Sequence, residues 1–353
     1  MASHTSTVER HGFKWILGIG LALLGSAAII SANPDAHCAA RSGAGVRWLR
    51  VAPSDEHVAI DRWCFPVGVP VRIGGRPRAD VPAGAVAVVS WNTHVGAGDI
   101  DGLVTDLRSG RLTAGRPVTS FVLLLQEVYR SGDTVPSEAT REGRWASAQR
   151  PSGPGGRRDD VAASAKRLGL EAFYAPSMRN GAPGATDEDR GNAILSTMPL
   201  SDLTAIELPL ERQRRVALQA TVTLTVPGYA PVLLRVVSTH FTNMVMHHIW
   251  VLSESGRLRQ ARALATVLPA DGPLVLGGDF NAWFGFRDAA YKELVRLVPA
   301  PSSDDRRATF GPMRLDHILA RLPPGWRAAT RRAGARYGSD HYPLVATIEP
   351  PPT

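Results

Sequence analysis

The sequence predicts an α/β (α+β) domain over residues 85–349, and three observations carry that prediction. Short apolar runs rich in β-branched residues recur along this region, each bounded by turn-forming residues, which is the pattern of strands. Segments with apolar residues three and four positions apart lie between some of these runs, which is the pattern of amphipathic helices. Hydrophobic residues make up 44% of the 353 residues, which is enough for a packed core.

The strands and helices are expected in a definite order along the chain. Eight apolar runs predict strands over residues 85–92, 121–128, 192–200, 216–224, 232–241, 273–281, 314–320 and 342–349. Helical spacing predicts helices over residues 159–170, 255–268 and 287–298. Many strands with interspersed helices, and no visible internal repeat, indicate an α/β or α+β architecture.

The first 32 residues have the pattern of an export segment. A basic lead with Arg10 and Lys14 precedes an uncharged apolar run, Trp15–Ala32, with small residues toward its end. This pattern matches a signal peptide, with cleavage expected after Ala32, and the run is also long enough for a marginal membrane-spanning helix. We therefore expect an exported, extracytoplasmic protein. Residues 1–32 are either a cleaved signal peptide or a retained N-terminal membrane anchor.

Residues 33–84 are expected to form an extended lead-in segment, because they are rich in Arg, Pro and Gly. Both cysteines of the chain, Cys38 and Cys64, lie in this segment. Two cysteines in an exported protein can form one disulfide bridge, and two unrelated thiols are the alternative. Neither cysteine has further Cys or His residues at the spacing of zinc ligands, so the sequence does not predict a zinc site.

The charge of the chain suggests an anionic partner but does not specify one. The net charge is +8 and the isoelectric point is near 10.0, which suits nucleic acid or a phospholipid surface. Only three of the 40 basic residues are Lys, and such an Arg bias is expected of a GC-rich genome whatever the function. No obligate protein partner is inferred from the sequence.

Polar side chains gather where the predicted strands end. This set combines amides, carboxylates and imidazoles, namely Asn92, Glu127, His240, Asp279, Asn281, Asp316, Asp340 and His341. One such residue beside a strand is usually a turn former or a solvated group. So many of them at the carboxyl ends of apolar runs predict a functional site, because sites of sheet proteins are commonly assembled at that edge.

The order of these motifs along the chain resembles the endonuclease/exonuclease/phosphatase superfamily, which has the deoxyribonuclease-I-like fold. The motifs that carry the resemblance are "SWN", "LLQE", "GNAILS", "STHF", "GGDFN", "RLDHI" and "GSDHYP". The resemblance covers residues 85–349. It implies a four-layer sandwich of two mixed β-sheets packed face to face and flanked by helices, and an enzyme that hydrolyses phosphoric esters with Mg²⁺ or Mn²⁺.

The resemblance also implies roles for most of these residues. Glu127 is expected to be the principal metal ligand, assisted by Asn92, with Asp340 in or beside the metal site. One carboxylate and one amide are chemically sufficient, because Mg²⁺ keeps several of its waters. Asp279 is expected to orient or deprotonate the attacking water. His341 is expected to be the catalytic histidine.

Further roles concern the phosphate and the catalytic imidazole. Asp316 is expected to hold the imidazole of the catalytic histidine. His240 is expected to bind the phosphate or to help protonate the leaving group. Asn281 is expected to donate to a phosphate oxygen, and Arg190 and Asn192, in "RGNAILS", are expected phosphate-side contacts.

The sequence departs from one branch of the family. Some apurinic-type nucleases carry an acid two residues after the asparagine of the first strand, and here that position is His94. This departure weakens any assignment to DNA repair, for which an exported protein is in any case poorly suited.

The sequence favours an exported nuclease-like phosphodiesterase. The positive charge and the Arg-rich stretch 141–158 support nucleic acid as the substrate. A sphingomyelinase-like or other phospholipid phosphodiesterase or phosphatase is the alternative. The apolar stretch 243–252 supports it as a membrane contact, although the start of a buried helix is the favoured explanation of that stretch. A catalytically silent binding module is disfavoured, because the set of expected catalytic residues is intact.

Overall fold

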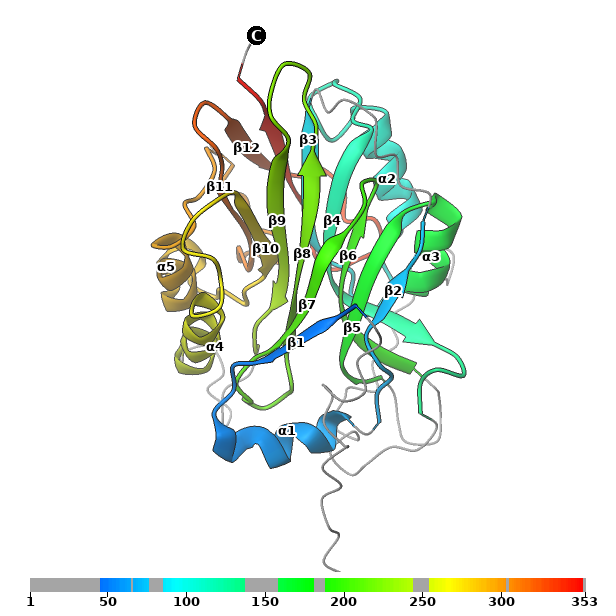
Figure 1. The fold of residues 1–353 in the computed structure, drawn as a ribbon, viewed down its shortest axis with the longest axis vertical. Coiled ribbons are helices and arrows are strands. Elements are labelled where there is room, and N and C mark those ends of the chain that lie inside the picture. Colours follow the sequence, from blue (N-terminus) through cyan, green and yellow to red (C-terminus); the bar gives the residue numbers. More distant parts are fainter. Residues whose placement is uncertain are drawn as a thin grey trace, which may run out of the picture. The chain divides into compact units, whose positions relative to one another are not determined.

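Within the described residues, two mixed β-sheets pack face to face (Figure 1). These residues belong to a unit of residues 34–353 that is distinct from residues 1–33. The computed structural model describes residues 45–64, 66–75, 85–136, 158–180, 188–243, 254–302 and 305–351. The predicted export segment, most of the stretch 141–158 and most of the stretch 243–252 lie outside the described residues. Within the described residues, no helix has the length and apolarity needed to span a membrane.

The first sheet has six strands. Their spatial order is β1 (Arg47–Arg50), β7 (Ser201–Glu207), β8 (Val216–Leu224), β9 (Val232–His240), β10 (Leu274–Asp279) and β11 (Asp316–Arg321). Strand β1 runs parallel to β7 and strand β9 parallel to β10, whereas the other neighbours are antiparallel. The sheet is therefore mixed.

The second sheet has seven strands. Their spatial order is β12 (Arg327–Arg332), β13 (Leu344–Glu349), β3 (Val86–Asn92), β4 (Ser120–Ser131), β6 (Glu188–Ser196), β5 (Glu171–Arg179) and β2 (Val71–Ile73). Strands β3 and β4 are parallel, and the remaining neighbours are antiparallel. This sheet is also mixed.

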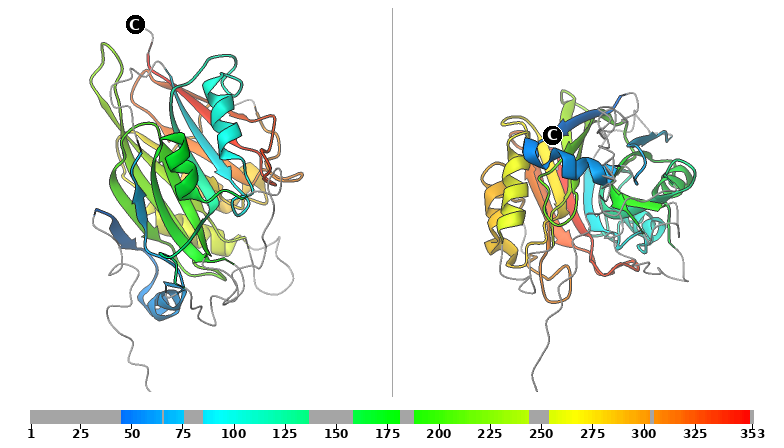
Figure 2. Two further views of the ribbon diagram at one scale, coloured as in Figure 1. Left: turned by 90° about the vertical axis from the view of Figure 1, so that its right-hand side faces the viewer. Right: turned by 90° about the horizontal axis from the view of Figure 1, so that it is seen from below.

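Helices cover the outer face of each sheet and complete four layers. Helices α4 (Ser255–Ala265) and α5 (Ala289–Val295) pack on the first sheet, and α2 (Ile100–Arg108) and α3 (Val161–Leu168) on the second (Figure 2). Alternate residues of β3 point to opposite sides, as the pleat requires. Those facing the other sheet join the central core, and those facing away join the core beneath α2 and α3. The predicted four-layer sandwich is confirmed.

The eight predicted strands and three predicted helices are all present, and only the strand over residues 216–224 has the predicted ends. Sequence analysis did not identify strands β5, β7 and β12 or helix α2. Strand β5 contains Pro176 and β12 contains three arginines, so neither reads as a regular alternation of apolar and polar residues. Strand β7 begins only five residues after β6 ends, so the sequence pattern does not separate the two strands.

The lead-in segment differs from the expected extended chain. It contains helix α1 (His57–Cys64), a 3₁₀ turn η2 (Ser54–Glu56) and the strands β1 and β2. Strand β1 extends one sheet and β2 extends the other, because sheet edges present unpaired backbone groups that recruit even short segments. Cys64 is disulfide-bonded, and Cys38 lies outside the described residues.

Buried ion pairs and hydrogen bonds fix this segment to the sandwich. Arg50 Nε lies 2.6 Å from Glu207 Oε2, and the backbone amide of Gly68 donates to Asp189 Oδ2 over 2.7 Å. Arg130 Nη2 donates to the same carboxylate oxygen over 2.7 Å. We call Arg50, Gly68, Arg130, Asp189 and Glu207 the lead-in clamp. Its contacts are short and shielded from water, so the segment is an integral part of the fold.

Candidate active site

Strand pairing brings the predicted site residues of the first sheet together. Strands β9 and β10 are parallel and end in register, with His240 beside Asp279. Strand β11 runs antiparallel to β10, so that its first residue, Asp316, lies opposite Asp279. In the second sheet, the parallel strands β3 and β4 place Asn92 beside Gln126. These ends meet on one edge of the sandwich.

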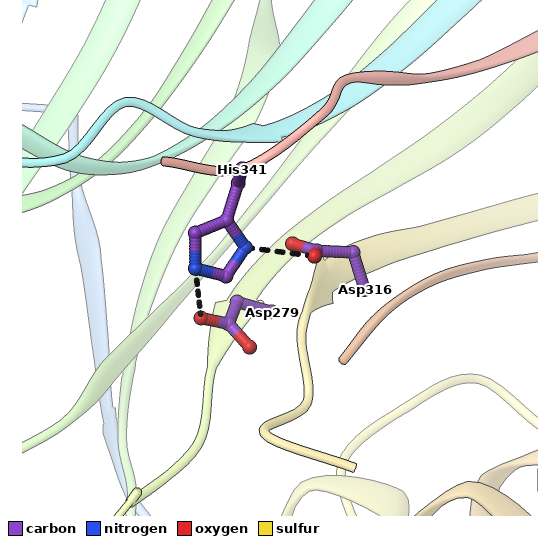
Figure 3. A group of neighbouring side chains, drawn as sticks. All are labelled: Asp279, Asp316 and His341. Carbon is purple, nitrogen blue, oxygen red and sulfur yellow. Dashed lines mark hydrogen bonds and ion pairs between the residues drawn. The ribbon is translucent and has the colours of Figure 1, made fainter. Parts of the chain in front are cut away.

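A carboxylate holds the imidazole of His341. Its Nδ1 lies 2.8 Å from Asp316 Oδ2 (Figure 3). The backbone on both sides is fixed: the amide of His341 donates to Ser339 Oγ over 3.0 Å, and Trp91 Nε1 donates to the His341 carbonyl over 3.1 Å. The ring of Phe310 lies 4.8 Å from the imidazole centre. The other ring nitrogen, Nε2, is thereby directed toward the rest of the site.

The charge state of His341 follows from its two acidic neighbours. Burial lowers the pKa of the imidazole, but the carboxylates Asp316 and Asp279 outweigh burial and raise the pKa to about 10. The His341 Nε2 atom lies 3.9 Å from Asp279 Oδ2 and 4.0 Å from Asp340 Oδ1. In this state the imidazole is protonated at neutral pH and can donate a proton or a charged hydrogen bond.

Asp279 lies at the centre of the site. Its Oδ1 accepts from the Asn281 backbone amide over 2.8 Å, and its Oδ2 accepts from Asn92 Nδ2 over 3.0 Å. His240 Nε2 lies 3.4 Å from the same Oδ2. Burial and the nearby Asp316 raise the pKa of Asp279 to about 6. A carboxylate with this pKa is suited to act as a base near neutral pH.

Glu127 projects from a bulge rather than from a strand end. Strand β4 was expected to end at residue 128 but continues to Ser131, and its register with β6 shifts between Leu125 and Val128. Glu127 has a positive φ of 53° in this bulge, a conformation that non-glycine residues rarely adopt. Bulges re-aim a side chain without ending the strand. The observed backbone is therefore what directs this carboxylate.

Glu127 is ionised and remains accessible. Burial raises its pKa, but the guanidinium groups of Arg190 and Arg215 outweigh burial, and the net effect lowers the pKa. Arg190 Nη1 lies 3.7 Å from one carboxylate oxygen and His240 Nδ1 lies 3.9 Å from the other. Its side chain is 19% exposed, so that a ligand can approach it.

Arg215 is a site residue that sequence analysis missed. It is only 4% exposed, and its Nη1 lies 3.3 Å from His240 Nδ1. Burial lowers the pKa of Arg215 to about 10, and Glu127 counteracts part of that effect. Burial and Arg215 together lower the pKa of His240 well below its usual value. The sequence feature that could have identified Arg215 is its position directly before a buried strand, in "RQRRVALQA".

The three predicted phosphate contacts, Asn281, Asn192 and Arg190, already interact with other groups of the protein. Asn281 Nδ2 donates to the Phe241 carbonyl over 2.9 Å, and Asn281 has a positive φ of 49° beyond the end of β10. The strand was predicted to include Asn281, but it ends at Asp279. Asn192 Nδ2 donates to the Val216 carbonyl over 2.8 Å, and within the described residues it makes no hydrogen bond or ion pair with another predicted site residue. Arg190 faces Glu127.

Two sets of residues are compared as candidates for holding a divalent cation. One is the predicted set of Glu127, Asn92 and Asp340. The other is Asp279, Asp316 and His341, whose ligand atoms lie within 4.8 Å of one another. The second group is almost fully buried and His341 Nδ1 is already bonded to Asp316, whereas Mg²⁺ retains several waters. The partly exposed, ionised carboxylate of Glu127 fits a hydrated cation better. The side chain of Asp340 is 37% exposed and lies 4.0 Å from His341 Nε2.

Comparison with known proteins identifies the family. The model of the Endonuclease/Exonuclease/phosphatase family matches residues 89–341. The chain belongs to this family. Members of the endonuclease/exonuclease/phosphatase family are generally phosphoric ester hydrolases and typically depend on a divalent metal. The resemblance noted in the sequence is thereby confirmed, and all ten predicted site residues fall inside the matched region or at its end.

Individual proteins that resemble this chain do so at low sequence identity or over a short stretch. UPF0294 protein VP2298 of Vibrio parahaemolyticus is 35% identical over 94 residues, which are 25% of this chain and 32% of that protein. An endonuclease/exonuclease/phosphatase from Beutenbergia cavernae is 19% identical with a TM-score of 0.50, over 76% of this chain and 72% of that one. Sphingomyelinase C from Streptomyces griseocarneus is 16% identical with a TM-score of 0.43, over 74% and 99%. At 19% identity, the Beutenbergia structure shows that the fold is shared.

Proposed function

We propose that this protein hydrolyses phosphodiesters with the help of a divalent cation. The observation that carries the proposal is the acid–imidazole cluster, by which we mean Glu127, His240, Asp279, Asp316 and His341. Each member lies within 4.0 Å of another member. Phosphodiester hydrolysis needs a base for the attacking water and donors for developing negative charge, and the cluster contains both.

The chain's own residues divide this work by their charge. Asp279, with its pKa near 6, accepts a proton from the attacking water. His341 holds a proton on Nε2 through Asp316 and donates to the phosphoryl oxygens or to the leaving oxygen. His240, whose pKa is lowered, binds the phosphate as a neutral hydrogen-bond donor.

Glu127 is the proposed anchor of the cation, with Asn92 and Asp340 as its partners. A bound Mg²⁺ or Mn²⁺ would neutralise charge on the phosphate and position it. Activity on a phosphodiester should therefore disappear in excess EDTA and return with Mg²⁺ or Mn²⁺. The simple substrate bis(p-nitrophenyl) phosphate allows this measurement without any assumption about the natural substrate. Undiminished turnover in excess chelator would contradict the proposal.

We propose nucleic acid as the substrate ahead of a phospholipid. The residue after His341 is Tyr342, whose ring centre lies 3.8 Å from the guanidinium carbon of Arg332 and 4.7 Å from that of Arg336. Arg332 also lines a hollow of about 790 Å³ in which five arginines face one acid among the described residues, namely Arg111, Arg306, Arg307, Arg331, Arg332 and Asp305. Arginine pairs well with phosphate, so this surface favours a long polyanion.

A substrate panel separates the two candidates. Plasmid DNA, RNA, sphingomyelin and phosphoinositides would be compared with Mg²⁺ at equal protein concentration. We expect cleavage of nucleic acid that weakens steeply as salt rises, because phosphate contacts release counterions. Cleavage of sphingomyelin or phosphoinositide with intact DNA and RNA would favour the phospholipid alternative instead.

Export is the remaining part of the proposal. The basic lead and apolar run of residues 1–32 support it, as does the disulfide bond of Cys64, because disulfides persist in oxidising compartments. Fractionation of cells that express the full chain should place it outside the cytoplasm, in secreted or membrane-anchored form. A fully cytoplasmic protein with both cysteines reduced would contradict this part.

A further inference from the structure

Two neighbouring arginines before strand β8 are used very differently. Arg214 Nε donates to Glu207 Oε1 over 2.8 Å, and its Nη1 donates to two backbone carbonyls. Arg215 is almost as buried, but its Nε has no hydrogen-bond partner in the described structure. The contact of Arg215 that stands out is the one to His240 Nδ1, at 3.3 Å. Arg214 is held by structure, and Arg215 is directed at an imidazole.

This contact decides which nitrogen of His240 carries the proton. A guanidinium has only donors, so Arg215 donates and His240 Nδ1 accepts with its lone pair. A neutral imidazole with an unprotonated Nδ1 carries its proton on Nε2. That nitrogen lies 3.4 Å from Asp279 Oδ2, on the side where the phosphate is expected.

Without Arg215, a second arrangement would compete. His240 Nδ1 lies 3.9 Å from Glu127 Oε1, so a proton on Nδ1 would pair with this carboxylate. The proton on Nε2 would then be lost or shared, and one oxygen of Glu127 would be occupied by the imidazole. Arg215 is nearer to Nδ1 than Glu127 is, and it cannot accept a proton.

We propose that Arg215 is a positioning residue that fixes the Nε2–H tautomer of His240 and keeps Glu127 available for its ligand. This inference rests on the proposed phosphodiesterase function for its purpose, but not for its main test. Arg215 acts through His240 and Glu127 and need not touch the substrate. The residue therefore links the two halves of the site, one on β4 and the other on β9 and β10.

The first test reads the tautomer directly and needs neither metal nor substrate. The full chain would be labelled with ¹⁵N-histidine, and the His240 signals assigned by their loss in His240→Gln. In the wild type we expect an unprotonated Nδ1 and a protonated Nε2. In Arg215→Met, which removes every donor at similar length, we expect Nδ1 to become protonated. An unchanged Nε2–H tautomer in folded Arg215→Met would overturn the proposal.

The second test separates positioning from a general need for charge. Arg215→Lys keeps a cationic donor and should retain the tautomer and most of the activity, whereas Arg215→Met should lose about 10–100-fold in kcat. Arg214→Lys makes the same exchange one residue earlier and should leave the His240 signals unchanged. If Arg215→Lys and Arg215→Met lose equal activity and both keep the wild-type tautomer, the proposed role is wrong.

If no phosphodiester is cleaved by the wild type, the proposed function fails and the tautomer result still stands or falls by itself. Circular dichroism of each variant confirms that the chain is folded before its signals are compared. Should Arg215→Met not fold, Arg215→Lys supplies the comparison, because its ammonium group has only donors and should retain the Nε2–H tautomer. Protonation of Nδ1 in folded Arg215→Lys would overturn the proposal.

Discussion

The lead-in clamp and the acid–imidazole cluster are both buried sets of charged groups, but they are built in opposite ways. In the clamp, unlike charges meet at 2.6 and 2.7 Å. In the cluster, His240 lies 3.4 Å from Asp279 and 3.9 Å from Glu127, and two carboxylates lie side by side on β10 and β11. Only the pair of His341 and Asp316 is as close as a clamp contact, at 2.8 Å.

This difference separates groups that stabilise the fold from groups that await a ligand. A buried charge must be paired at close range, or the loss of hydration outweighs the attraction. The clamp meets that condition with its own residues. The cluster leaves carboxylates and imidazoles at longer range and shifts their pKa values, which is common at functional sites. Mutations should therefore act on stability in the clamp and on rate in the cluster.

The largest expected effect concerns the one close pair of the cluster. His341→Ala and Asp316→Ala should each lower kcat by about 10³–10⁴-fold, because the imidazole needs both its proton and its orientation. The double variant should be little slower than the slower single variant, since groups acting as one unit are not additive. Steady-state kinetics on bis(p-nitrophenyl) phosphate measures all three.

The alternative for this pair is a structural Asp316. In that case Asp316→Ala would lower the melting temperature, leave kcat nearly unchanged, and combine additively with His341→Ala. Thermal melts of the same three proteins would show this. Such a result would show that Asp316 stabilises the fold, as the clamp residues do, and does not contribute to the rate.

The strand ends that form the site could be predicted from the sequence for a physical reason, whereas the pairing of Asp316 with His341 was implied only by the resemblance to the family. Parallel strands such as β9 and β10 end at the same edge, so a residue that closes an apolar run is placed by the sheet itself. Glu127 was assigned correctly as a strand residue but not as part of a bulge, because a register shift depends on the partner strand β6. Arg215 was missed, because only the folded chain brings it to His240.

The lead-in segment shows the same limit. Strands β1 and β2 contain four and three residues, too few to show a periodicity. Their conformation is imposed by the sheet edges and by Asp189 and Glu207, which lie more than a hundred residues further along the chain. Pattern analysis detects elements that bury a periodic face, and it does not detect those that are recruited by an edge.

The next effect, in stability, belongs to the clamp. Asp189→Asn would leave Arg130 buried without its carboxylate, and Tyr174 would lose a charged partner that its hydroxyl contacts at 2.6 Å. Removing one partner of a buried pair costs about 3–5 kcal/mol. We expect urea denaturation to show a loss of this size, with kcat per folded molecule unchanged.

A half-exposed pair provides the matched control for the clamp. Arg167 and Asp101 are bonded at 2.7 Å with side chains 41% and 36% exposed, so Asp101→Asn should cost less than about 1 kcal/mol. Equal losses in Asp189→Asn and Asp101→Asn would show that burial does not give the clamp its effect. The contrast between the two regions would then lose its physical basis.

The smallest effect has the opposite sign and lies in the cluster. The pKa of Asp279 is raised to about 6 by burial and by Asp316, against about 3.9 in an unfolded chain. Above pH 6 the folded protein must keep a carboxylate ionised where ionisation is disfavoured, so the charge lowers its stability. Asp279→Asn removes that charge. In EDTA at pH 7 to 8 it should raise the free energy of unfolding by about 1–2 kcal/mol, even though it abolishes activity.

The pH dependence identifies the cause of this gain. As the pH falls from 6 to 4, the folded wild type takes up the proton at Asp279 before the unfolded chain does. The difference in the free energy of unfolding between the wild type and Asp279→Asn therefore shrinks and vanishes below pH 4. The variant has no ionisable group at this position, so this site gives it no such pH dependence. Urea denaturation of both proteins across this range, at fixed ionic strength in EDTA, measures the gap. If Asp279→Asn were destabilised as strongly as Asp189→Asn, Asp279 would be a structural carboxylate of the clamp type, since an ionised group that supports the fold loses stability when it is replaced.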